Sequence, residues 1–85
     1  MSTENQENNL ITILSQVCLE KLEENRHKKH WNEFEIMWLF DRIEEEIKEL
    51  KKAVISGKPV IDVWREAADV ANFAAFIAQN FETLK

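Results

Sequence analysis

The sequence predicts an all-α fold with three main helices. Glycine and proline each occur once in 85 residues, whereas a many-stranded β fold needs such turn residues about every ten residues. Apolar residues instead recur at helical spacing over three long stretches. Because a domain of this size buries only about 60% of its unfolded surface, we also expect the helices to assemble into an oligomeric bundle, dimeric or tetrameric.

The three helices are expected to form one domain over residues 10–85. Residues 1–9 are polar, without a hydrophobic period, and are predicted to be a disordered tail. From the apolar spacing, the helices are predicted at about 10–25, 33–56 and 60–83.

Local signals mark two of the helix ends. Asn32 and Glu35 have the spacing of a capping pair at the start of the second helix. Gly57 and Pro59 are expected to end that helix, because glycine adopts the left-handed stop conformation and proline cannot continue a helix.

Composition excludes several classes of partner. A formal net charge of −5 opposes binding to a nucleic acid polymer or to an anionic membrane. The stretch 67–78 is too short and too polar to span a bilayer, and no signal peptide is recognisable at the start. Cys18 is the single cysteine, so an intrachain disulfide is impossible and a reducing, cytoplasmic location is expected.

Acidic residues interrupt the apolar faces of the second and third helices. Glu46 and Glu49 lie one turn apart at the edge of the apolar stripe, and Glu66 and Asp69 share an arc with phenylalanines such as Phe73. A buried carboxylate costs several kcal/mol unless it is compensated. Two such pairs on packed helices would present four carboxylates to one cation, and oxygen ligands suit Mg²⁺, with Mn²⁺ as a substitute.

The spacing of these acids resembles the signature of a known superfamily. Glu46-x-x-Glu49, sixteen intervening residues and Glu66-x-x-Asp69 are similar to the motif of the all-α NTP pyrophosphatases, in particular the MazG-type nucleotide pyrophosphohydrolases. The stretches 42–53 and 66–74 are similar to the second and third helices of that family, and 25–31 to its connector.

The resemblance implies a Mg²⁺-dependent enzyme that hydrolyses a (deoxy)nucleoside triphosphate to the monophosphate and pyrophosphate. Such an enzyme would serve nucleotide-pool housekeeping or dNTP adjustment as a homodimer or homotetramer. By position, the metal ligands are Glu46, Glu49, Glu66 and Asp69, one of which also helps to deprotonate the attacking water. Glu45 matches an often acidic position that supports the catalytic pair Glu46 and Glu49, and Asn72 matches a position that contacts metal or nucleotide.

The basic connector gains a role within the same hypothesis. Arg26, Lys28 and Lys29 are candidates for binding phosphates, and Trp31 is a candidate for stacking on the base. A solvated loop explains the three cations equally well, and packing explains the tryptophan.

Two interpretations without hydrolysis remain open. In the first, the acids are surface charges paired with nearby cations, and the chain is a non-catalytic helical interaction module. In the second, the chain binds nucleotide without turnover. The first alternative pairs the acids with Lys48, Lys51, Lys52 and Arg65. A phosphoribosyl-ATP pyrophosphatase is less favoured, because the Tyr-His pair typical of that branch is absent from residues 70–73. For Asn72, the alternative interpretation is an ordinary buried hydrogen-bonding residue.

Overall fold

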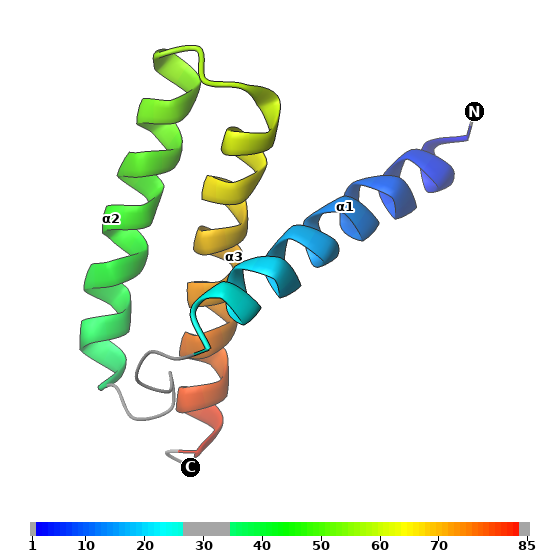
Figure 1. The fold of residues 1–85 in the computed structure, drawn as a ribbon. Helices are drawn as coiled ribbons and strands as arrows, with labels where there is room; N and C mark the ends of the chain where they lie inside the picture. The colour runs from blue at the N-terminus through cyan, green and yellow to red at the C-terminus, as the bar shows by residue number, and fades with distance from the viewer. Residues whose placement is uncertain (1, 27–34, 84–85) are drawn as a thin grey trace.

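The computed structural model describes residues 2–26 and 35–83, which form three helices (Figure 1). They are α1 (Thr3–Glu24), α2 (Ile36–Ile55) and α3 (Val60–Thr83). No strand occurs within these two ranges, so the predicted all-α class is confirmed for the described part of the chain. None of the helices there has both the length and the hydropathy needed to cross a membrane.

α1 begins at Thr3, so the prediction that the helix starts at Leu10 after a tail is wrong for residues 3–9. The Ser2 hydroxyl accepts a hydrogen bond from the backbone N–H of Asn5 at 3.3 Å, and Glu4 lies in the first turn, where a negative charge favours the helix dipole. The side chains of this first segment are exposed. A helical segment with no buried face has no hydrophobic period, and the sequence pattern therefore missed it.

α2 begins at Ile36, three positions later than predicted. Glu35 has extended backbone dihedrals (φ −71°, ψ 145°) and occupies the N-cap position without a side-chain capping bond. Glu35 is thus the cap itself and not the third residue of a capping pair, and that part of the prediction is wrong. Asn32, its proposed partner, lies outside the described residues.

A tight turn joins α2 to α3 and makes the two helices antiparallel neighbours (Figure 1). Gly57 has φ +69°, and its N–H donates to the carbonyl of Val54 at 3.2 Å. The next N–H, of Lys58, donates to the carbonyl of Ala53 at 3.0 Å. This pair of bonds is the Schellman motif, and Pro59 follows directly before α3. The predicted stop at Gly57 and start at Val60 are both confirmed.

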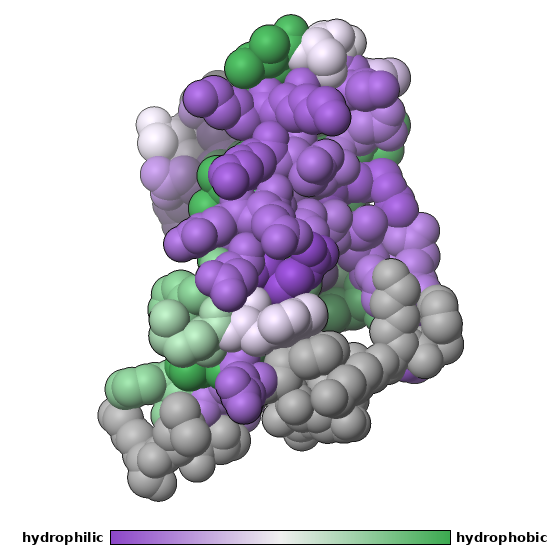
Figure 2. Space-filling model, turned by 90° about the vertical axis from the view of Figure 1, so that its left-hand side faces the viewer, coloured by the Kyte–Doolittle hydropathy of each residue, from purple (hydrophilic) through white to green (hydrophobic). Residues whose placement is uncertain are grey.

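α3 is the central element, because it packs against both α2 and α1. Within the described ranges the buried apolar side chains are Val17, Leu39, Ala53 and Ala68. Ala53 belongs to α2, and Ala68 belongs to α3, where its carbonyl lies against the Cys18 thiol of α1. Figure 2 views the α2 side of the molecule, where hydrophilic atoms cover most of the described surface and hydrophobic atoms show at its margins.

Candidate metal centre

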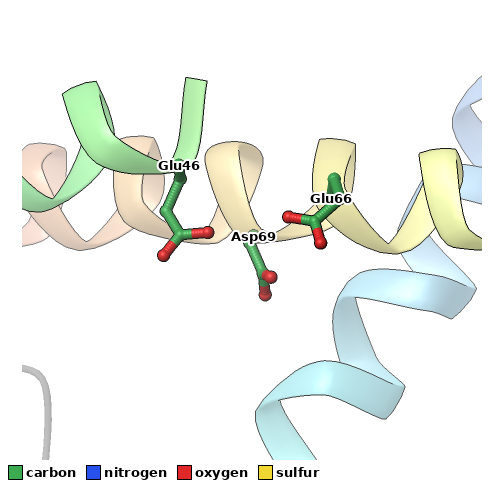
Figure 3. A group of neighbouring side chains, drawn as sticks. All are labelled: Glu46, Glu66 and Asp69. Atoms are coloured by element: carbon green, nitrogen blue, oxygen red, sulfur yellow. The ribbon is translucent and has the colours of Figure 1, made fainter. Parts of the chain in front are cut away.

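Three of the four predicted metal ligands converge between α2 and α3. Glu46 comes from α2, whereas Glu66 and Asp69 lie one turn apart on α3, and one carboxylate oxygen from each lies within 4.8 Å of the others. Figure 3 shows the three side chains directed toward a common region beside the two helices. The i, i+3 spacing puts both α3 carboxylates on one side of that helix, and the antiparallel packing brings Glu46 opposite them. We call these three residues the acidic cluster.

The acidic cluster is sheltered from water. The side chain of Glu46 is 12% exposed and that of Asp69 is 20% exposed. Burial is the largest cause of a raised pKa at all three carboxyls, Glu46, Glu66 and Asp69. The negative charge of Asp69 further raises the pKa of Glu46 and of Glu66. The charged forms of these groups are therefore less favourable in the fold than in water.

Two cations, neither of which the sequence reasoning had assigned to the site, lie against the acidic cluster. Lys21 of α1 places Nζ at 3.4 Å from Oδ2 of Asp69, and Arg42 donates to Oε1 of Glu46 at 2.8 Å. Each lowers the pKa of its partner, but burial and the neighbouring acids outweigh that effect. Three carboxylates thus face two paired cations, and the charge of Arg65 adds a smaller attraction to Asp69.

The sequence held a signal for each of these cations. Arg42 lies one turn before Glu46 on α2, the i, i+4 spacing of a helical ion pair. Its guanidinium also lies 5.9 Å from the ring centroid of Trp38 and 5.5 Å from that of Phe73, distances typical of cation–π contacts. Lys21 continues the apolar stripe of α1 one turn after Val17, where a solvent-facing lysine is unexpected.

Glu49, the fourth predicted ligand, is exposed and is not one of the three converging residues. It remains close enough to Glu66 to raise the pKa of that carboxyl. Glu45 is exposed and forms an ion pair with Arg42, so it is tied to the acidic cluster through the cation that also binds Glu46.

Asn72 is buried and fastens α1 to α3. Its side-chain amide donates to the carbonyl of Cys18 at 3.1 Å, and the Cys18 thiol contacts the carbonyl of Ala68 at 3.8 Å. These contacts hold the C-terminal half of α1 on α3 and so place Lys21 beside Asp69. The hydrogen-bonding alternative for Asn72 is confirmed, while its predicted contact with nucleotide stays a prediction.

The predicted phosphate-binding connector lies almost wholly outside the described residues. Lys28, Lys29 and Trp31 fall in the range 27–34. Arg26 is exposed in the turn after α1, and its backbone N–H donates to the carbonyl of Glu23 at 3.2 Å.

A pocket of about 390 Å³ adjoins the acidic cluster and is lined by both acidic and basic residues. Glu66 belongs to both the pocket and the cluster, and Glu49 and Asp62 add two more acids to the lining. Four basic residues line the same pocket: Lys21, Lys52, Lys58 and Arg65. Arg65 is held by Glu24 of α1 at 2.7 Å. A pocket with cations next to clustered carboxylates suits an anionic ligand that carries a divalent metal ion.

The comparisons with known proteins give no match: no family model, no curated protein and no solved structure matches the chain. The functional hypothesis therefore depends on the residues themselves.

Proposed function

We propose that the acidic cluster binds a divalent cation, Mg²⁺ or Mn²⁺, and that the chain hydrolyses a (deoxy)nucleoside triphosphate to the monophosphate and pyrophosphate. The observation that carries the proposal is the convergence of three sheltered carboxylates from two helices within 4.8 Å. The spacing of these acids, which resembles the MazG-type motif, supplies the reaction class.

In this proposal the carboxylates bind the metal ion, and the basic residues of the adjoining pocket bind the substrate. Glu46, Glu66 and Asp69 would hold the ion, and Glu49 lines the adjoining pocket together with Glu66. A bound Mg²⁺ lowers the pKa of a coordinated water and neutralises negative charge on the phosphates. Lys52 and Lys58, which line the adjoining pocket, are placed to receive phosphate oxygens that the ion does not contact.

One observation favours a second candidate, a non-catalytic helical interaction module. Lys21 and Arg42 already pair with Asp69 and Glu46, as in a charge network that only orients three helices. In that case the acidic cluster would need no metal ion. Of the cations predicted to pair with these acids, Arg65 forms its ion pair with Glu24, and its charge also lowers the pKa of Asp69.

Pyrophosphate release tests the catalytic part of the proposal. We expect release from at least one nucleoside triphosphate, in a panel of NTPs and dNTPs with Mg²⁺. Glu46→Gln and Asp69→Asn should each lower the rate by at least about 100-fold, since even outer partners of metal ligands are worth 10–100-fold. The matched controls are Glu44→Gln and Asp41→Asn, because both acids are exposed on α2, and these variants should keep the full rate.

Thermal unfolding in increasing Mg²⁺ tests the metal site without a substrate. A ligand that binds only the folded state stabilises it by about 2.7 kcal/mol at 100 times its dissociation constant, so the melting temperature of the unmodified chain should rise. Asp69→Asn should abolish the rise. If the melting temperature does not change with Mg²⁺ or Mn²⁺ and no pyrophosphate is released, both the metal site and the enzyme are refuted.

A further inference from the structure

Lys21 is the charged residue among the sheltered side chains of α1. Over residues 3–24, all of which the structure describes, the other buried or half-buried side chains are Leu14, Val17, Cys18 and Leu22. A lysine usually keeps its ammonium group in water, but the Lys21 side chain is only 19% exposed and its Nζ lies 3.4 Å from Oδ2 of Asp69. Because a sheltered charge needs an anionic partner, Lys21 depends on the acidic cluster.

The charge of Lys21 reaches the whole acidic cluster. It lowers the pKa of all three carboxyls, Glu46, Glu66 and Asp69. The three carboxylates come from α2 and α3, so Lys21 is a cation that another helix supplies to them. It gives the acidic cluster positive charge of the kind that a bound metal ion would also give.

The hold of α1 on the rest of the fold depends on a short segment around Lys21. Among the described elements α1 contacts α3 but not α2, and its exposed first half projects away from the other helices (Figure 1). Polar contacts with α3 recur every three residues along α1, at Cys18, Lys21 and Glu24. Residues at this spacing lie on one side of a helix, and the Lys21 contact is the middle one. Its loss should therefore loosen the C-terminal half of α1.

We propose that Lys21 and a divalent cation exclude each other at Asp69, so that metal binding releases the Lys21 ammonium and loosens the C-terminal half of α1 from α3. The inference rests on the metal site of the proposed function. An ammonium group and a metal ion on one carboxylate are like charges at short range, and a site sheltered from water screens their repulsion poorly. By linkage, the factor by which the metal weakens the docking of α1 equals the factor by which docked Lys21 weakens metal binding.

Binding of Mn²⁺, followed by the electron paramagnetic resonance signal of the free ion, tests the competition without a substrate. Lys21→Met removes the charge but keeps an unbranched side chain, and it should lower the Mn²⁺ dissociation constant at least about 5-fold, the lower end of typical coupling between sites. The matched control is Lys48→Met, which removes the same charge from the exposed face of α2. At physiological ionic strength that variant should change the constant less than about 2-fold. Equal or weaker binding by Lys21→Met would overturn the inference, while Mn²⁺ binding by the unmodified chain would still support the metal site.

Amide hydrogen exchange of the unmodified chain tests the consequence for α1, and it decides alone if Lys21→Met does not fold. Saturating Mg²⁺ should speed exchange at residues 18–24 at least about 5-fold and slow it in α2 and α3, which supply the ligands. In Lys21→Met the ion pair is already absent, so Mg²⁺ should not speed exchange in α1. Unchanged or slower exchange at residues 18–24, with slower exchange in α2 and α3, would overturn the inference and leave the metal site standing. No change in any helix would refute both.

Discussion

The side of α2 that packs against α3 and the exposed side of the same helix carry the same residue types, but their side chains differ in exposure to water. Glu44, Glu45 and Glu46 are consecutive in the sequence. Glu46 is sheltered against α3 beside two further carboxylates, whereas the other two are exposed. Successive residues are rotated by about 100°, so one position decides whether a carboxylate is a solvated charge or a candidate ligand. The helical spacing had already assigned Glu46 to the edge of the apolar stripe, and the structure brings it to the acidic cluster.

The same rotation separates the apolar residues. Leu39 is 0% exposed, while its neighbour Phe40 is 42% exposed. The larger aromatic residue therefore lies outside, and a smaller aliphatic residue forms the core.

The largest loss of stability should come from a substitution on the side of α2 that packs against α3. Leu39→Ala removes a fully buried side chain and should lower the free energy of unfolding by about 2–5 kcal/mol. Met37→Ala, two positions away and exposed, should change it by less than about 0.5 kcal/mol. Urea unfolding of both variants measures the difference. Equal losses would show that the two faces of α2 are not distinct in the folded protein.

Replacement of a cation that pairs with the acidic cluster should cause the next largest loss of stability. Arg42→Met leaves Glu46 sheltered without its ion pair and should destabilise the fold by about 1–3 kcal/mol. Lys48→Met, on the exposed face of the same helix, should be nearly neutral. Arg42→Met lacks the cation that competes with Mg²⁺ for Glu46. Mg²⁺ should therefore raise the stability of Arg42→Met more than that of the unmodified chain. No restoration by Mg²⁺ would count against a metal site at Glu46.

The effect of pH on stability should be smaller than the effects of these two substitutions. Its sign is unusual, because stability should rise as the pH falls. The folded-state pKa values of Glu46, Glu66 and Asp69 are raised, so the fold binds protons more readily than the unfolded chain does. Their contribution to stability is then greatest at low pH and is lost as the pH rises through the raised values. The melting temperature should increase when the pH falls from 7 toward 5.

Two controls separate the acidic cluster from the other acids. Asp69→Asn should reduce the dependence on pH, and saturating Mg²⁺ should do the same because it favours the charged carboxylates. Asp41→Asn should leave the dependence unchanged, since Asp41 is exposed. A melting temperature that falls steadily from pH 7 to 5 in the unmodified chain would contradict the raised pKa values.

Some of the acidic cluster was predictable from sequence and some was not. Glu46, Glu66 and Asp69 were identifiable because charged residues on an apolar face need compensation. Their partners were harder to assign: Lys21 lies on another helix, forty-eight positions before Asp69, and sequence spacing carries no information on such a contact. The role of Asn72 in binding α1 to α3 depends on the same tertiary contact.

By itself, the sequence determined the all-α class, the turn at Gly57 and the bounds of α3, because helical periodicity and left-handed glycine act over a few neighbouring residues. Tertiary structure alone decided that Lys21 meets Asp69 and that Glu49 stays outside the converging carboxylates. These outcomes depend on how two helices cross and rotate against a third. A rotation of a few tens of degrees changes them while every local signal in the sequence stays the same.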